Sequence, residues 1–373
     1  VMFKPLFRVI LLNVLCIFLL SYSEVEEQRV TDMKLLWGAV DIPPKIAADY
    51  IHTVIDAHRR FYSQHIVDRL AKTQSLQATE DWAHEGTLLL PDQFLLASSQ
   101  TANNQGIGMR YRLMSLWPIN ERNAPKSELE KIGLKAVVDN PKEPFTWIVD
   151  KGSSQYFQAI YPDFAVAQSC TSCHNNHAKS PRNNFKMGDV MGGIIINLPL
   201  GKRKVSKVDS KVLLPPEVVA NYIHSVVASH RHVYSKYIVD RLQDKNILRS
   251  TENWLQEKAL PLPAQFLMET SQVVRDRRLG LDFRLISLQP INRSNGPANE
   301  FERVGLEAVE VHPARPYIGQ TRLGGRDIFQ AIYPDLAVSQ GCIACHNAHP
   351  QSPKKDYKMN DVMGGIVVTL YLQ

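Results

Sequence analysis

The sequence predicts an α+β protein made of two tandem copies of one unit, each a small antiparallel sheet flanked by helices that include a long N-terminal helix. Three observations lead to this prediction. One offset of 172 residues relates the halves of the chain, as in Trp82 and Trp254. Each half opens with apolar residues at helical spacing and ends with runs that are rich in β-branched residues. A period this long indicates a duplicated domain and not a solenoid.

The offset also sets the expected domain boundaries. It holds without insertion from "PPKIAADYIHTV" (43–54) and "PPEVVANYIHSV" (215–226) to the end of each copy. We therefore expect a first domain over 24–200 and a second over 215–373. Residues 201–214 join them, because this stretch is polar, rich in lysine and poor in large apolar side chains.

Each copy is expected to open with a long helix. Pro44 and Pro216 suit a first helical turn. The residues that recur at spacings of three to four are Ile51, Ile55, His58, Tyr62 and Ile66 in the first copy and Ile223, Val227, His230, Tyr234 and Ile238 in the second. This stripe should face the interior, with His58 and His230 at its centre.

The remaining elements follow in the same order in both copies. A second helix is expected from Pro91 and Pro263, and strands over 109–120 and 281–292. A short helix should cover Glu128–Val138, followed by strands in "FTWIVD" and "QYFQAIYPD". The closing strands are "DVMGGIIINLPL" and "DVMGGIVVTLYL", whose glycine pair indicates a bulge or a close backbone approach.

The N-terminal 23 residues have the pattern of a secretory signal, with Lys4 and Arg8 before an apolar core of twelve residues, Val9 to Leu20. Twelve residues are few for a bilayer span, and an uncleaved anchor is the alternative. Export predicts a periplasmic protein. Association with a membrane is expected only if this segment is retained.

The net charge excludes one class of partner. The chain carries +6, and removing the N-terminal segment leaves +4 because Lys4 and Arg8 are lost with no acid before Glu24. No basic stripe is interleaved with aromatic residues, so nucleic acid is not an expected partner.

Four of the five cysteines lie in two pentapeptides of the form Cys-x-x-Cys-His. These are "CTSCH" (Cys170, Cys173, His174) and "CIACH" (Cys342, Cys345, His346). The fifth, Cys16, lies in the apolar N-terminal segment. Two thiols three residues apart can add to the two vinyl groups of one haem, and the following histidine can then bind the iron as proximal ligand. We therefore expect two haem c groups, one in each copy.

Three other readings of the motif compete. A thioredoxin-like redox pair has no need of the histidine. A zinc site formed by Cys170, Cys173, His174 and His177 would crowd a tetrahedron. Disulfides would close two short local loops that constrain little of the chain.

The distal iron ligand is less defined. His58 and His230 are the first choice, because each lies on the inward face of a long helix at equivalent positions; the alternative is a core histidine. His177 and His349, Met187 and Met359, and Met191 and Met363 are further candidates. Tyr62, Tyr234, Arg112 and Arg284 are candidates for hydrogen bonds to a propionate or a bound ligand.

Several segments resemble a known family. "HRRFYSQHIVDRL", "SLWPINERNAP", "AIYPDFAVAQSCTSCHNNH" and "FKMGDVMGG", with their second copies, are similar to the PAS-like, single-haem c-type domain family of the Tll type. The resemblance implies a PAS-like α/β fold, one covalent haem per domain, and a role in electron transfer or haem-based sensing. A described member uses a cysteine as distal ligand, whereas here no cysteine remains outside the motifs after the N-terminal segment.

These observations favour a periplasmic dihaem c-type cytochrome that passes single electrons to a redox partner protein, which the sequence does not identify. It would be an electron carrier and not a catalyst. A haem-based redox or gas sensor is the alternative. A dihaem peroxidase is a third reading, but the close similarity of the two copies argues against the division of labour that it needs.

Overall fold

The structure, a computed structural model, describes residues 40–202 and 212–372. The N-terminal segment over 1–23 and most of the junction over 201–214 lie outside the described residues. Residues Ile42–Leu372 form one compact unit that contains both copies. Among the described residues, no helix has the length and apolar character needed to cross a membrane.

The first copy runs through eight longer elements in order. They are helix α2 (Pro44–Phe61), helix α5 (Pro91–Asn103), strand β1 (Arg110–Met114), helix α6 (Glu128–Asp139), strands β2 (Phe145–Lys151) and β3 (Ser154–Phe164), helix α7 (Gln168–Asn176) and strand β4 (Val190–Lys202). Short helices α3 (Arg69–Lys72), α4 (Trp82–Glu85) and η2 (Glu121–Asn123) lie between them.

The second copy repeats this order. Its longer elements are α8 (Pro216–Val233), α10 (Pro263–Asp276), β7 (Leu281–Ile286), α11 (Glu300–Val311), β8 (Tyr317–Leu323), β9 (Arg326–Leu336), α12 (Gln340–Ala348) and β10 (Val362–Tyr371). Its short elements are α9 (Arg241–Asp244), η4 (Arg293–Asn295) and the strands β5 (Ser250–Thr251) and β6 (Leu260–Pro261). The expected α+β class with two tandem units is confirmed.

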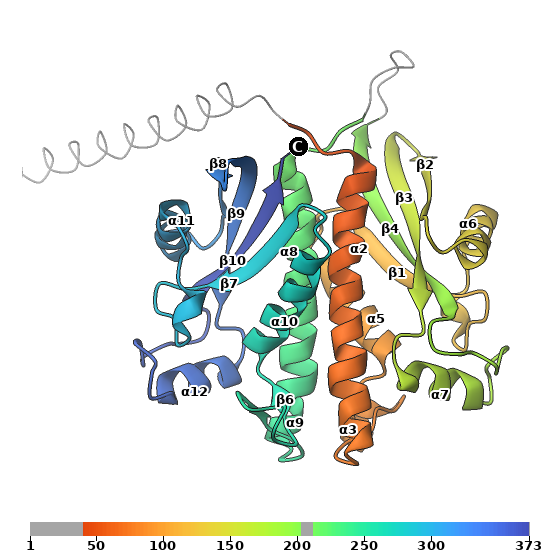
Figure 1. Cartoon of the computed structure of the whole chain (residues 1–373), viewed down its shortest axis with the longest axis horizontal. Coiled ribbons are helices and arrows are strands. Elements are labelled where there is room, and N and C mark those ends of the chain that lie inside the picture. Colours follow the sequence, from red (N-terminus) through yellow and green to blue (C-terminus); the bar gives the residue numbers. More distant parts are fainter. Residues whose placement is uncertain (1–39, 203–211, 373) are drawn as a thin grey trace, which may run out of the picture. The chain divides into compact units, whose positions relative to one another are not determined.

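Each copy builds one four-stranded sheet, in the order β1-β4-β3-β2 or β7-β10-β9-β8. All neighbouring strands in these two sheets are antiparallel. The long helix packs on one face of the sheet and the shorter α6 or α11 on the other, so both faces are covered (Figure 1). The antiparallel sheets agree with the expectation from sequence, although β1 and β7 are shorter than the runs that predicted them.

The long helix differs from the expectation in one respect. After α2 the chain continues as a π-helical segment, η1 (Tyr62–Asp68), and after α8 as its equivalent η3 (Tyr234–Asp240). The wider turn rotates the following side chains, which a simple periodic pattern does not reveal. The predicted stripe itself is buried, and Ile51, His58 and Ile66 are fully inaccessible.

The glycine pair in each closing strand combines a bulge with a close backbone approach. The pairing of β10 with β9 shifts register between Val362 and Gly364. A side chain on Gly192 would collide with the carbonyl oxygen of Met114, and one on Gly364 with that of Ile286. Both features that the pair was expected to mark are therefore present.

The two copies pack through equivalent residues. Ile42 and Leu214 exchange two backbone hydrogen bonds of 2.8 Å, the His58 and His230 rings lie 4.9 Å apart, and Phe94 faces Phe266. Each of these pairs is separated by the 172-residue offset, so the copies are related by a pseudo-twofold axis that passes near all three.

Contacts away from the axis are reciprocal. Arg69 donates hydrogen bonds to the carbonyl oxygens of Trp254 and Ala259 in the other copy. Arg241 does the same to Trp82 and Thr87, and each guanidinium lies 4.9 Å from the tryptophan ring whose carbonyl it binds. Between these contacts, one continuous hydrophobic core spans both copies.

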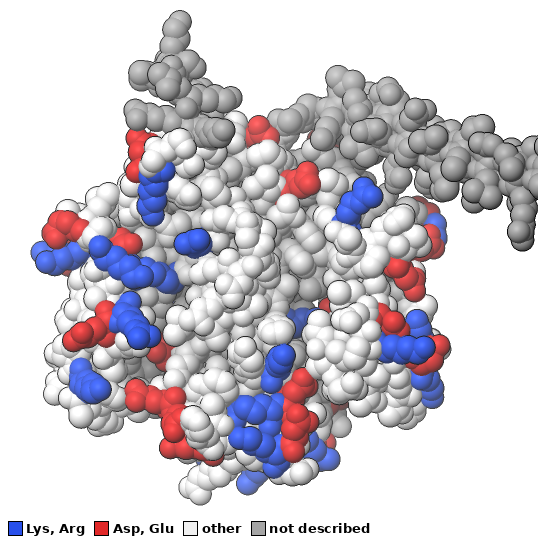
Figure 2. Space-filling view, turned by 180° about the vertical axis from the view of Figure 1, so that it is seen from behind, with Lys and Arg blue, Asp and Glu red and all other residues white. Residues whose placement is uncertain are grey.

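Charges of both signs are interspersed on the face shown in Figure 2. Charged side chains of the structure also pair locally, as Arg303 does with Glu300 and Glu307. This face carries no extended basic surface.

Candidate haem-attachment centres

Each Cys-x-x-Cys-His motif lies on a nine-residue helix, α7 or α12, which we call the attachment helix. The sequence analysis did not predict these helices, because their apolar pattern is weak. In Figure 1 they lie at the outer ends of the two copies, away from the central pair α2 and α8. The helical turn places the two cysteines on one side of the helix, one turn apart.

The π-helical segment fixes the start of the first attachment helix. The carboxylate of Asp68 accepts hydrogen bonds from the backbone N–H groups of Gln168 at 2.7 Å and Ser169 at 3.0 Å. Gln64 donates to the carbonyl of Val166 at 2.6 Å. Because a carboxylate satisfies free N–H groups and complements the helix dipole, Asp68 caps α7.

The second copy caps its helix in a different way. Ser339 accepts a hydrogen bond from the N–H of Cys342 at 3.3 Å, and its hydroxyl bonds to Asp240 at 3.3 Å. Asp240 is the equivalent of Asp68. The acid is thus kept in both copies, but in the second it acts through a serine.

A buried ion pair ties the long helix to the end of the strand that precedes the motif. Arg59 donates to Asp163 at 3.0 Å and also bonds to the carbonyl of Phe164. Arg231 and Asp335 form the equivalent pair. Burial raises the pKa of Asp163 to about 6, although Arg59 acts in the opposite direction. The arrangement holds the chain that leads into α7 against α2.

An asparagine directly after the histidine anchors the returning chain. Asn175 exchanges two hydrogen bonds with the backbone of Phe185, and Asn347 does the same with Tyr357. The His174 ring lies edge-on to Phe185 with centroids 5.7 Å apart, and His346 has the same relation to Tyr357. Each histidine therefore has an aromatic ring packed beside it.

The donor atoms suit covalent haem attachment. All four cysteines are free thiols in the structure, so the disulfide alternative is not formed. Burial raises the pKa of the Cys173 thiol, and burial lowers the pKa of both His174 and His346. A lowered pKa favours the neutral imidazole, which is the form that binds iron.

Each motif histidine has one buried ring nitrogen without a hydrogen-bond partner among the described residues. The Nδ1 atoms of His174 and His346 are inaccessible and have no hydrogen-bond partner within the described residues. Buried polar atoms are normally satisfied. Free thiols one turn apart and a neutral histidine directly after them fit an attached haem.

The zinc alternative receives no support from the geometry. His177 lies 3.3 Å from Glu80, and His349 lies 3.5 Å from Glu252. The Nδ1 of His177 also accepts the N–H of Lys179. In the part of the chain that the structure describes, no three histidine, cysteine or acidic side chains are grouped so that they could hold a metal ion.

His58 and His230 lie elsewhere. Both are fully buried beside the pseudo-twofold axis, where their ring contacts are with each other and with phenylalanine and tyrosine residues of the core. Tyr111 shares a hydrogen bond of 2.8 Å with Nε2 of His230. These are the surroundings of core histidines, and the structure does not bring either ring to a Cys-x-x-Cys-His motif. Iron ligation by His58 and His230 stays a prediction.

The other candidates separate into structural and exposed residues. Tyr62 and Tyr234 donate to the backbone carbonyls of Leu89 and Pro261. Arg112 pairs with Glu130, and Arg284 with Glu302. Met187 and Met359 are exposed in turns, whereas Met191 and Met363 are buried beside the attachment helices.

The residues that sequence reasoning missed are those that position the motif. No known short motif links the cysteines to these residues, which are Asp68, Arg59, Asp163 and Asn175 in the first copy. The one available signal was their identity in the second copy, where Asp240, Arg231, Asp335 and Asn347 occupy the equivalent positions.

Comparison with known proteins gives one result. A protein-family model described as Tll0287-like matches the chain twice, over residues 44–199 and 212–370. No match was found among curated proteins or among solved structures. The two matched ranges cover both copies and include both attachment helices.

Proposed function

This chain belongs to the Tll0287-like family, and from that premise we propose that it is a dihaem c-type cytochrome that transfers single electrons. Membership makes it a haem-binding, cytochrome-type protein of two tandem domains. The proposal adds one covalent haem c at each Cys-x-x-Cys-His motif, export to the periplasm and an exchange of electrons with a redox partner protein.

The observation that carries the proposal is the repeated attachment helix. Two copies that differ in many surface residues keep the cysteines, the histidine, the asparagine after it and the aromatic ring against the histidine. A haem bound there supplies a one-electron Fe(III)/Fe(II) couple.

The protein's own residues hold this couple in place. Cys170 and Cys173 form the thioether links in the first copy, and His174 binds the iron. Asp68 fixes the start of the helix, and Arg59 with Asp163 fixes the strand before it. Cys342, Cys345 and His346 take the same roles in the second copy. Single-electron transfer needs no further acid or base.

Substituting the proximal histidines tests the proposal. His174→Ala should remove or convert the low-spin spectrum of one haem, and His346→Ala that of the other, because each iron loses a ligand. The measurement is the visible spectrum in both oxidation states, with the haem count from the alkaline pyridine spectrum. His84→Ala is the control, since His84 is exposed and pairs with Asp81. Unchanged spectra in both variants would contradict the assignment.

The core location of His58 and His230 favours a second candidate function. If neither ring reaches an iron and none of the other distal candidates does, a sixth position is open, as a haem-based sensor requires. Carbon monoxide uptake by the reduced protein distinguishes the two functions. No uptake supports electron transfer with both sixth positions filled, and uptake supports sensing.

A further inference from the structure

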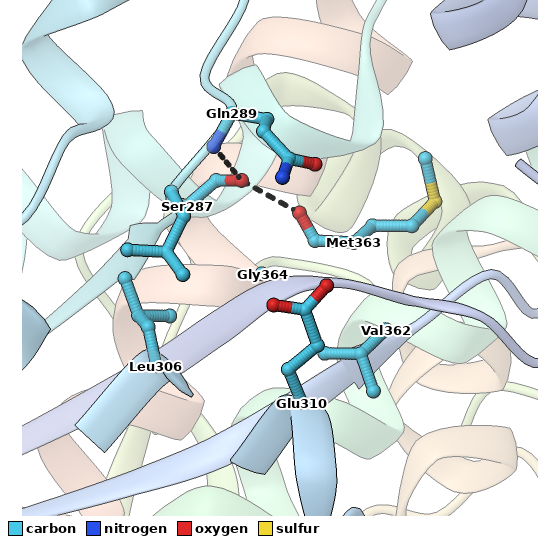
Figure 3. A pocket seen from close by; sticks show the side chains of 8 residues that line it. Ser287, Gln289, Leu306, Glu310, Val362, Met363 and Gly364 are labelled. Atoms are coloured by element: carbon cyan, nitrogen blue, oxygen red, sulfur yellow. Dashed lines mark hydrogen bonds between the residues drawn. The ribbon is translucent and has the colours of Figure 1, made fainter. Parts of the chain in front are cut away.

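A small surface hollow lies beside the second attachment centre. It is lined by Ser287, Leu288, Gln289, Leu306, Glu310, Val362, Met363 and Gly364. Figure 3 shows the Glu310 carboxylate, from α11, directed into the same space as Gln289 and the backbone of Met363. Its polar lining side chains are Ser287, Gln289 and Glu310, and Glu310 is exposed to solvent.

A hydrogen bond connects the hollow to the attachment centre. The hydroxyl of Tyr357 donates to Oε1 of Gln289 at 3.2 Å. The ring of Tyr357 packs against His346 and near Cys342. A polar path therefore leads from solvent through Gln289 to the side chain beside the proximal histidine.

The first copy has the same backbone and different side chains. The Ser115 hydroxyl accepts a hydrogen bond from the N–H of Trp117 and donates one to the carbonyl of Met191. In the second copy, Ser287 makes the same two bonds with Gln289 and Met363. However, Trp117 replaces Gln289, Phe185 replaces Tyr357 and Val138 replaces Glu310. Trp117 packs on Phe185 with centroids 5.7 Å apart, and Arg182 covers both rings.

The charges near the two centres differ as well. Glu310, Asp356 and Asp361 all act to raise the pKa of Tyr357, after burial. The equivalent positions in the first copy are Val138, Asn184 and Asp189, so the second copy has two more carboxylates on this side. The cation is matched, because Lys354 lies over Tyr357 as Arg182 lies over Phe185.

We propose that this polar, solvent-facing flank gives the haem of the second copy the lower reduction potential, so that a single electron on the chain resides on the first copy. The inference rests on the proposed function. Reduction removes one positive charge from the iron centre. A tyrosine hydroxyl and carboxylates on a solvent-facing side stabilise the ferric state more than an apolar wall does. Transfer from the second iron to the first balances as one electron, with no bond or proton changed.

One carboxylate in the first copy acts in the opposite direction. Asp92 lies near Cys173, where the second copy has Ala264. Burial raises the pKa of Asp92, which disfavours its charged form. The second copy still has one carboxylate more, because it has Glu310 and Asp356 where the first copy has only Asp92, and Asp92→Ala should raise the potential of the first haem further.

The experiment is a redox titration of the full holoprotein followed at the visible haem bands. We expect two one-electron waves whose midpoint potentials differ by at least 59 mV, which is a tenfold difference in equilibrium constant. A Cys342→Ala/Cys345→Ala variant, which keeps the first haem alone, should retain the higher wave. One unresolved wave, or a higher wave that belongs to the second haem, overturns the inference.

Exchanging the flanks supplies the matched variants. One triple variant combines Gln289→Trp, Tyr357→Phe and Glu310→Val. It should raise the potential of the lower wave towards that of the higher wave, which should not move. Trp117→Gln with Phe185→Tyr and Val138→Glu should lower the higher wave. If a triple variant fails to fold, Tyr357→Phe alone should shift the lower wave upwards by a smaller amount. An unmoved wave in Tyr357→Phe and in the folded exchange variants also overturns the inference.

The haem count separates the two levels of proposal. Fewer than two covalent haems per chain contradicts the proposed function itself. Two haems with equal potentials leave the dihaem cytochrome intact and contradict the inequivalence alone.

Discussion

At the scale of single residues, the pair His58 and His230 shows how a duplicated chain departs from its own symmetry. Nε2 of His230 shares a hydrogen bond with the Tyr111 hydroxyl. The equivalent of Tyr111 is Phe283, which meets His58 edge-on with centroids 5.8 Å apart. Both ring nitrogens of His58 are therefore buried without a partner among the described residues. Such an atom costs on the order of 1–3 kcal/mol.

Exchanging one hydroxyl group tests this account. Tyr111→Phe should lower the free energy of unfolding by about 1–3 kcal/mol, because it leaves Nε2 of His230 unpaired. Phe283→Tyr should instead raise it by about 1 kcal/mol by giving His58 the same partner. Urea unfolding of both variants is the measurement. Equal stability of Tyr111→Phe and the parent protein would show that this hydrogen bond contributes nothing.

At the scale of elements, the π-helical segment explains how the first attachment helix is held. The wider turn of η1 presents Asp68 to the first N–H groups of α7, and this contact joins residues 100 positions apart. A weakly amphipathic helix of nine residues is not stable by itself in water. Its position therefore depends on the contacts at its start and on Asn175 near its end.

Asp68→Ala should destabilise the protein by about 0.5–2 kcal/mol, because two N–H groups lose their acceptor. It should also lower the fraction of chains that carry haem in the first copy, since the motif is less ordered when the haem is added. Urea unfolding and the haem count measure the two effects. Asp81→Ala, at an exposed acid, is the matched control. Full haem content with unchanged stability would contradict the capping role.

Much of the element pattern could be predicted from the sequence, and the parts that could not have physical reasons. The helices from Pro91 and Glu128 and the closing strands were predicted because their period matches their burial. The attachment helix was missed because Asp68 and Asn175 stabilise it instead of an apolar stripe. The positions of His58 and His230 were predicted to be buried, but periodicity indicates only that a face is covered. It does not indicate whether a cofactor or a second copy covers it.

At the scale of the whole molecule, the two copies behave as an isologous dimer within one chain. Arg69 and Arg241 exchange equivalent hydrogen bonds, and the core is continuous. Two buried histidines, His58 and His230, and two half-buried ones, His52 and His224, lie on the long helices. Burial lowers the pKa of His52 to about 4 and those of His224 and His230 to about 3, and it also lowers the pKa of His58.

These shifts predict acid sensitivity. An unfolded histidine has a pKa of about 6.5, so between that pH and the lowered folded pKa the unfolded state binds more protons. Stability should therefore be complete above about pH 6.5 and fall as the pH drops towards 3, by up to about 1.4 kcal/mol per pH unit for each histidine. The measurement is the urea midpoint at a series of pH values.

His58→Leu is the matched variant, because leucine is apolar and similar in volume. It should lose less stability between pH 6.5 and 4.5 than the parent protein, and at pH 7 it should be at least as stable. An acid profile identical to that of the parent would show that His58 does not contribute.

The pseudo-twofold axis has a consequence for how such a protein can change over generations. In a dimer of identical chains every substitution occurs twice, so a change that suits one side of the axis is imposed on the other. Here each side is encoded separately. The chain can therefore carry Tyr111 on one side and Phe283 on the other, and Trp117 beside one centre and Gln289 beside the other. Fusion of the copies allows each Cys-x-x-Cys-His centre to be selected on its own.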